Sequence, residues 1–112
     1  MKDFLFGAAT AATQIEGGFN QDGKSLSVWD DYSARGLIFN KQTCYFACDS
    51  YNRLEEDLAL IKELGLTSYR FSLSWTRIQP TGRGAVNQKG IDYYNKLIDG
   101  LLAIGVKPFV TL

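Results

Sequence analysis

The chain has 112 residues, 46% hydrophobic and 21% charged, which is the composition of a folded domain and excludes a disordered protein. Twelve basic residues balance twelve acidic ones, so overall charge gives no reason to expect a nucleic-acid partner or a polybasic membrane contact. The absence of histidine excludes Ser-His and Cys-His nucleophile pairs, and Cys44 and Cys48 alone make a poor zinc site. We therefore expect no metal.

The first predicted element lies in the run FLFGAATAATQIEGG, Phe4 to Gly18. This run makes a poor secretion signal, because Asp3 neutralises Lys2 and its residues are small rather than leucine-rich. No stretch of the chain approaches the ~20 apolar residues of a membrane span. We interpret the run as a strand with Gln14 and Glu16 on one side. We expect a cytoplasmic protein, or an extracellular one if an N-terminal signal has been lost.

After a long loop, apolar side chains recur three and four residues apart in residues 49–65, which predicts an amphipathic helix ending at a glycine. The aromatic and hydroxyl residues of segment 67–75 predict a strand. A second amphipathic helix follows Asn87, a candidate N-cap, and also ends at a glycine. Residues 107–112 predict a third strand.

The two helix-to-strand junctions share one pattern. LGLTSYRF from Leu64 and IGVKPFVT from Ile104 each place a helix-ending glycine between aliphatic residues, with an aromatic residue shortly after. The two copies are about forty residues apart, within the range of repeated supersecondary units. Strands that alternate with amphipathic helices indicate an α/β fold, in which helices cover a parallel sheet.

One segment, GRGAVN at residues 82–87, is a candidate nucleotide loop. Asn87 occupies the place of the third glycine of a dinucleotide fingerprint, and the loop begins several residues after the strand rather than directly at its end. We interpret this segment as a turn and expect no cofactor.

Motifs along nearly the whole chain are shared with one enzyme family. They are the opening FLFGAATAATQIEGG and then SVWD, ELGL, YRFSLSW, RIQP, YYNKLID and PFVTL. On these motifs the sequence resembles the N-terminal part of the family 1 glycoside hydrolases, the β-glucosidase family. It departs from that family at Thr13, where an aromatic residue, Asn or His is usual, and at Cys44 and Tyr45, where a Gly-Asp pair is common.

The resemblance implies the N-terminal portion of a (β/α)₈ TIM barrel, namely its first two βα units and its third strand. A complete barrel needs about 250 residues. Residues 1–112 are therefore expected to form an incomplete glycoside hydrolase barrel domain. Because a strand edge and helix faces would be uncovered, we expect marginal stability for the isolated chain.

The family performs retaining hydrolysis of O-glycosyl bonds with two glutamates, one in an Asn-Glu-Pro motif and one in a Glu-Asn-Gly motif. Neither motif occurs in this sequence. The acidic residues 55–57 belong to a predicted helix, on the wrong surface for a barrel site. We therefore assign no catalytic acid or nucleophile to this chain and expect it to be inactive alone.

Two site residues follow from the resemblance. Gln14 matches the family glutamine that binds glycone hydroxyls, a task suited to an amide because it both donates and accepts; its alternative role is to cap a turn. Arg70 matches the arginine that supports the nucleophilic glutamate, and its alternative role is a buried ion pair. For Trp29 and Trp75 we favour core packing over sugar stacking.

The expected partner of the complete protein is thus a β-linked glucoside or a related glycoside, with no nucleic acid and no membrane span. Two alternatives use the same residues differently. In one, the protein is a klotho-like pseudo-enzyme or sugar-binding domain whose catalytic glutamates are replaced. In the other, it is a small standalone α/β binding module. The sequence indicates no particular oligomeric state.

Overall fold

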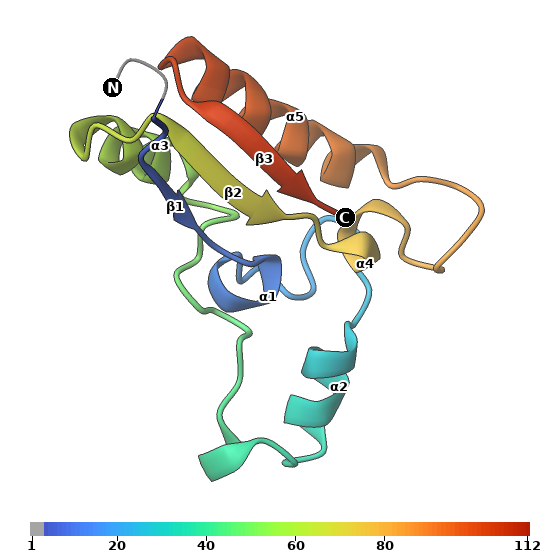
Figure 1. Ribbon diagram of the computed structural model, residues 1–112. Coiled ribbons are helices and arrows are strands. Elements are labelled where there is room, and N and C mark those ends of the chain that lie inside the picture. The colour runs from blue at the N-terminus through green and yellow to red at the C-terminus, as the bar shows by residue number, and fades with distance from the viewer. Residues whose placement is uncertain (1–3) are drawn as a thin grey trace.

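A parallel sheet forms the centre of the computed structural model, which describes residues 4–112 (Figure 1). Its strands lie in the order β1-β2-β3, with Gly7 opposite Ser68 and Ser68 opposite Lys107. Their bounds are β1 Gly7–Ala9, β2 Ser68–Ser72 and β3 Lys107–Thr111. The alternation of parallel strands with helices confirms the α/β class predicted from the sequence.

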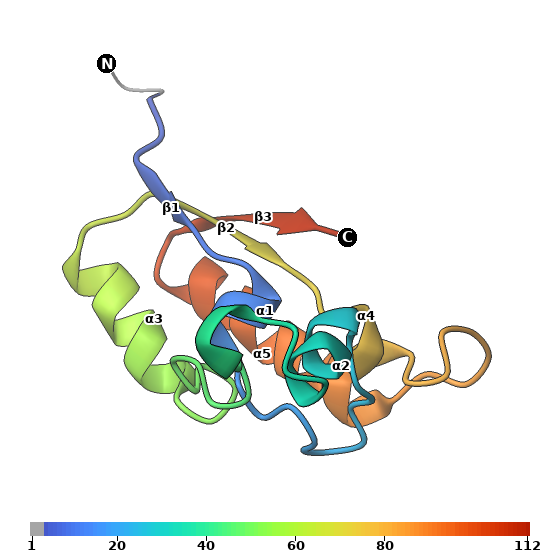
Figure 2. The same ribbon diagram turned by 90° about the horizontal axis from the view of Figure 1, so that it is seen from below.

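Two long helices cover one face of this sheet, α3 (Leu54–Glu63) and α5 (Gln88–Ala103), as Figure 2 shows. Alternation along β2 directs Tyr69 and Phe71 toward these helices, so both side chains are buried. The core that they enter contains Ile61, Tyr93, Tyr94, Leu97, Leu101 and Val106. Burial of each large apolar side chain contributes about 1.5–3 kcal/mol. The amphipathic periodicity therefore reflects the packing of both helices against β2.

Two glycines of α5 allow close packing on its neighbours. A Cβ at Gly100 would collide with the Leu58 side chain of α3, and a Cβ at Gly90 would collide with the Arg77 carbonyl. Glycine inside a helix costs about 0.5–1 kcal/mol relative to alanine. At Gly90 the cost accompanies a close approach to backbone, whereas at Gly100 a Cβ would require the Leu58 side chain to move.

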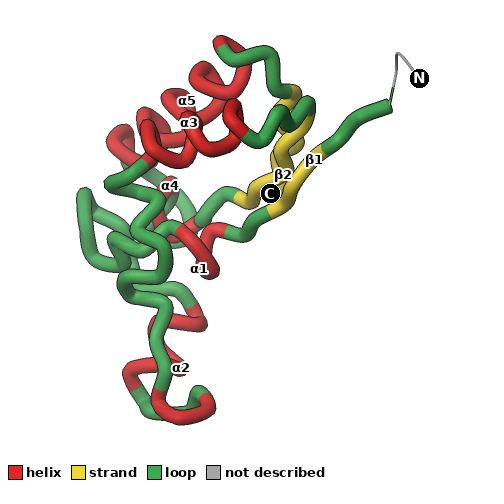
Figure 3. Tube along the Cα trace, turned by 90° about the vertical axis from the view of Figure 1, so that its left-hand side faces the viewer, coloured by secondary structure: helices red, strands yellow, loops and turns green. Residues whose placement is uncertain are grey.

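Short helices gather beyond the end of the sheet at which the strands terminate (Figure 1). They are α1 Ala12–Ile15, α2 Val28–Ala34, the 3₁₀ turn η1 Phe39–Lys41, and α4 Trp75–Ile78. Figure 3 shows α2 extending away from the sheet and its long helices. The segment expected to be a long loop thus contains helical turns. A capping box starts α2, since Ser27 and Asp30 each bond the backbone N–H of the other.

The predicted strand at Phe4–Gly18 is wrong over most of its length. Only Gly7–Ala9 are in β1, and residues 12–15 form α1, so Gln14 and Glu16 do not alternate on a strand. Thr10 N–H still donates to the Arg70 carbonyl, but Ala12 N–H donates to the side chain of Ser72 instead of a strand carbonyl, and the ladder ends there. Small residues with no clear period can form either structure, and these contacts select the turn.

Other boundaries differ by smaller amounts. The helix predicted over 49–65 begins at Leu54, because Asp49 has a left-handed φ of 54° and starts a turn. The strand predicted over 67–75 ends at Ser72. Asn87 does occupy the N-cap position of α5, but its side chain donates to backbone carbonyls outside that helix.

The N-terminal residues 1–3 lie outside the described part of the chain, and with them the Lys2 and Asp3 considered for a secretion signal. None of the helices within residues 4–112 is long and apolar enough to span a membrane.

Candidate functional site

The candidate site lies at the carboxyl ends of the strands, where α1 follows β1 and α4 follows β2 (Figure 1). Parallel α/β proteins bind their ligands at this end, because the connecting loops converge there. The two residues singled out from the sequence come from different elements. Gln14 belongs to α1 and Arg70 belongs to β2.

Gln14 is exposed and lies on a helix of only 4 residues. Such a helix has too few internal hydrogen bonds to be stable by itself, so its position depends on its neighbours. At its start, Ala12 N–H donates to Ser72 Oγ at 2.9 Å. At its end, the Ile15 carbonyl accepts from Ser50 N–H at 3.0 Å. The Gln14 side chain is thus presented to solvent by a helix tied to two other segments.

Arg70 lies on β2 with its side chain on the face opposite to Tyr69 and Phe71. That face is not covered by α3 or α5, and Arg70 is exposed. Ala9 and Phe109 flank it in the neighbouring strands. Among residues 4–112 no carboxylate forms an ion pair with its guanidinium, so the alternative of a buried ion pair is not seen in this part of the chain.

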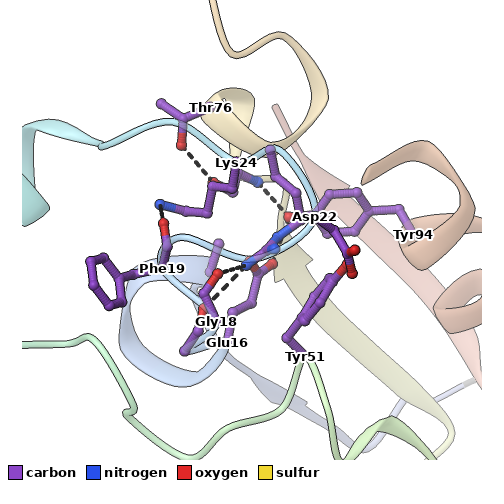
Figure 4. Close-up of polar contacts among 12 residues, drawn as sticks. Glu16, Gly18, Phe19, Asp22, Lys24, Tyr51, Thr76 and Tyr94 are labelled. Carbon is purple, nitrogen blue, oxygen red and sulfur yellow. Dashed lines mark hydrogen bonds and ion pairs between the residues drawn. The ribbon is translucent and has the colours of Figure 1, made fainter. Parts of the chain in front are cut away.

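A buried polar cluster that the sequence did not predict begins just after Gln14 (Figure 4). Glu16 and Arg77 are 5% and 0% exposed, and Arg77 Nε donates to Glu16 Oε2 at 3.1 Å. Arg77 Nη2 also donates to the Gly17 carbonyl at 3.1 Å. The other carboxylate oxygen of Glu16 accepts from Tyr94 Oη–H at 2.6 Å. The cluster therefore joins α1 to α4 and α5.

Aromatic rings enclose the Arg77 guanidinium. Its central carbon lies 3.9 Å from the centroid of the Tyr51 ring, a cation–π contact. Tyr51 Oη–H in turn donates to Asp22 Oδ2 at 2.7 Å. Burial, with this bond to Asp22, raises the pKa of Tyr51 to about 12. The bonds from Tyr51 and Lys89 lower the pKa of Asp22.

A second ion pair lies at the start of α2. Lys24 Nζ is 2.8 Å from Asp30 Oδ2, and both side chains are almost fully buried. Burial acts to raise the pKa of Asp30, but hydrogen bonds from Lys24 and Ser27 outweigh it, so that pKa is lowered. Lys24 also donates to the carbonyls of Phe19 and Ser25, which fixes the loop between α1 and α2.

The spacing between Glu16 and Arg77 is what concealed their pairing. They are 61 residues apart, and no local pattern links such distant residues. The one indication of burial for these two charges was that each has small or apolar neighbours in the sequence. The core packing expected for Trp29 and Trp75 is wrong, because both side chains are more than half exposed.

Beside Gln14, the cavity formed by the described residues is too small for a sugar. The cavity beside Thr13 and Glu16 has a volume of about 20 Å³, roughly the space for one water molecule. A larger groove of about 600 Å³ lies between Arg53 of the turn before α3 and Lys89 of α5, and neither Gln14 nor Arg70 lines it. A ligand pocket at Gln14 would therefore need walls from further chain.

Comparison with known proteins gives a consistent family assignment. The sequence model of glycosyl hydrolase family 1 matches residues 1–112. Cytosolic β-glucosidase of Homo sapiens is 58% identical over 112 residues, covering 97% of this chain and 24% of that protein. β-Glucosidase A of Acetivibrio thermocellus is 53% identical over 112 residues, covering 99% and 25%.

The solved structure of the family 1 β-glucosidase from Thermotoga maritima is also similar, with a TM-score of 0.96 and 50% identity. It covers 100% of this chain, which corresponds to 26% of that structure. The chain thus spans about a quarter of the length of its relatives. The parallel sheet and its helices match part of a TIM barrel, which confirms the predicted fold class. The chain belongs to glycosyl hydrolase family 1.

Proposed function

We propose that this chain is the N-terminal part of a β-glucosidase-type hydrolase and that Gln14 binds the glycone hydroxyls of a β-linked glucoside. The observation that carries this proposal is the exposed Gln14 amide, held at the carboxyl ends of the strands by a helix anchored at both ends. One amide can donate to one sugar hydroxyl and accept from the next. Related Thermotoga maritima structures are complexes with castanospermine and with isofagomine lactam, which supports a sugar-like ligand for the fold.

Arg70 has a second role in this proposal. Its guanidinium lies on the open face of β2, with small residues of β1 beside it. A fixed cation at that place would keep a neighbouring carboxylate ionised, which is the state that a retaining nucleophile requires. We assign Arg70 to the support of a nucleophile carried by the rest of the barrel.

The two catalytic carboxyl groups of a retaining mechanism lie about 5 to 5.5 Å apart. Glu16 is the carboxylate nearest to Gln14 in sequence, but Arg77 and Tyr94 already occupy it. We therefore propose that residues 1–112 form an incomplete barrel domain that binds part of the sugar and is inactive alone. The cytosolic β-glucosidases among its relatives favour a cytoplasmic location for the complete protein.

The test is a fusion enzyme in which residues 1–112 are joined to the remaining three quarters of the Thermotoga maritima β-glucosidase. We expect the fusion enzyme to hydrolyse an aryl β-glucoside, because 50% identity and a TM-score of 0.96 favour a complete barrel. A folded fusion enzyme without turnover would contradict the proposal. The klotho-like alternative is decided separately, by sequencing the gene beyond Leu112 for the Asn-Glu-Pro and Glu-Asn-Gly motifs.

A further inference from the structure

We propose that Glu16, Arg77 and Tyr94 are positioning residues for Gln14, so that their buried network sets where the Gln14 amide lies in the site. The inference rests on the sugar-binding role proposed for Gln14. It adds a set of residues that act on the sugar only through α1.

The C-terminal end of α1 is anchored by Glu16, two residues after Gln14. The Glu16 backbone N–H donates to the Ala12 carbonyl, and its own carbonyl accepts from Tyr51 N–H at 2.9 Å. Its side chain reaches Arg77 at the same point. A helix of 4 residues cannot hold its orientation alone, so a displacement of Glu16 would displace Gln14 as well.

Arg77 makes this anchor rigid because it is fully buried and held from several sides. Its guanidinium bonds Glu16 and the Gly17 carbonyl and stacks on the Tyr51 ring. Gly17 has a φ of 63°, and a Cβ there would collide with the Phe46 carbonyl, so the chain after α1 has little freedom. Within residues 4–112 Arg77 Nη1 has no hydrogen-bond partner, and Glu16 is the carboxylate that forms an ion pair with this buried guanidinium.

Tyr94 connects the same carboxylate to the strand that carries Arg70. Its hydroxyl donates to Glu16 Oε1 at 2.6 Å and accepts from Ser74 N–H at 2.7 Å. Ser74 lies just beyond the end of β2. The network thereby fixes α1 relative to β2, and so fixes Gln14 relative to Arg70. A sugar held by Gln14 would be placed correctly against a nucleophile that Arg70 supports only if this relation is kept.

The test is a double-mutant cycle of Gln14→Ala and Glu16→Gln in the fusion enzyme, read as kcat/KM on an aryl β-glucoside. We expect each single variant to lower kcat/KM about tenfold or more, the size of one lost hydrogen bond to substrate. The double variant should be less than about twofold worse than Gln14→Ala alone, because Glu16 then has no amide left to position. Glu56→Gln is the matched control, since Glu56 is exposed and lies on α3.

Losses that multiply in the double variant would overturn the inference, and so would an unchanged kcat/KM in Glu16→Gln. If Gln14→Ala alone leaves kcat/KM unchanged, the proposed sugar contact itself has failed, which is a different result. If Glu16→Gln lacks a cooperative thermal transition, the cycle is repeated with Tyr94→Phe, which keeps the ring and removes the hydroxyl that bonds Glu16 and Ser74 N–H. Non-multiplying losses in that cycle support the inference, and multiplying losses overturn it.

Discussion

The Arg77 guanidinium donates to the Glu16 carboxylate across 61 residues of sequence, with Nε 3.1 Å from Oε2 and both side chains buried. Such a pair does not add much stability compared with a well-packed apolar pair, but breaking it leaves one charge buried without compensation. The pair therefore matters most as a constraint, since a shift of α1 relative to α4 would separate two buried charges.

Removing only the Arg77 cation tests how much the buried ion pair with Glu16 constrains the fold. We expect Arg77→Met in the fusion enzyme to lower the free energy of unfolding by about 3–5 kcal/mol, because the Glu16 carboxyl group would remain buried without its ion-pair partner. Guanidinium chloride unfolding gives the value from the shift of the midpoint at constant slope. The control Arg53→Gln breaks an exposed pair with Glu56 and should lower the free energy of unfolding far less than Arg77→Met does. Equal losses for the two variants would contradict the role of burial.

The isolated chain should behave differently from a self-sufficient domain. Large apolar side chains remain exposed along β3 and on both long helices, including Phe109, Leu60 and Leu102. We expect a broad, weakly cooperative thermal transition by circular dichroism and binding of a hydrophobic dye. We also expect no release of aglycone from an aryl β-glucoside. A sharp transition in a monomer would instead favour the standalone binding module.

The sequence predicted those elements whose side chains repeat with a clear period. The helices α3 and α5 and the strands β2 and β3 were found because one face of each enters the core through residues such as Tyr69, Phe71 and Leu101. Their ends were misjudged by a few residues, since turns such as the one at Asp49 depend on backbone conformation rather than on periodicity.

The candidate site was less predictable, and the reason is local. The residues from Ala11 to Gln14 are small or polar and have no clear period, so periodicity does not distinguish a strand from a helical turn there. Only the helix preference of alanine favours the turn. The choice depends on contacts with Ser72 and Ser50, which are distant in sequence. The resemblance singled out Gln14 and Arg70 as site residues. The buried contacts that Glu16 makes with Arg77 and Tyr94 could not be predicted from any local pattern.

Gln14 should affect activity far more than stability. It is exposed, so we expect Gln14→Ala in the fusion enzyme to change the free energy of unfolding by no more than about 0.5 kcal/mol. The same change should lower kcat/KM about tenfold or more through the lost sugar contact. Gln88→Ala, an exposed glutamine on α5, is the control and should leave kcat/KM unchanged. A parallel loss of fold and activity would make Gln14 a structural residue.

Asp30 should make the stability depend on acid pH. Its pKa is lowered in the folded state by Lys24 and Ser27, so its stabilising contribution is complete above the unfolded pKa of about 3.9. That contribution is lost as pH falls through the lower folded value, because the unfolded chain binds the proton first. Below about pH 4, the free energy of unfolding should therefore fall more steeply in the unmodified fusion enzyme than in Asp30→Asn.

A second acidic residue of α2, Asp31, provides the control for Asp30→Asn. Asp31 pairs with Arg35 at 2.9 Å, but both side chains are more than half exposed. Asp31→Asn should shift the unfolding free energy by less than about 1 kcal/mol at neutral pH. Asp30→Asn should cost more there, since it leaves the buried Lys24 ammonium with a neutral partner. Identical acid profiles for the unmodified fusion enzyme and Asp30→Asn would show that the Lys24 contact does not stabilise the ionised carboxylate.

Arg70 should control the pH at which the nucleophile becomes ionised. Removing its charge in Arg70→Met would raise the pKa of a carboxylate that it supports, because an adjacent cation favours the ionised form. We therefore expect the acidic limb of the kcat/KM profile of the fusion enzyme to move to higher pH, with a lower maximum. Arg70→Lys keeps a positive charge and should move the limb by less, although it loses the planar two-donor geometry.

A purely structural Arg70 would give another pattern. It would lower kcat/KM at every pH by one factor and leave the acidic limb in place. Arg53→Met removes an arginine whose only ion pair within residues 4–112 is with Glu56 on the outer surface, and it should move neither the limb nor the maximum. A shift of the acidic limb in Arg70→Met that is absent in Arg53→Met would thus tie the β2 cation to the nucleophile, because general loss of folded enzyme changes only the height of the profile.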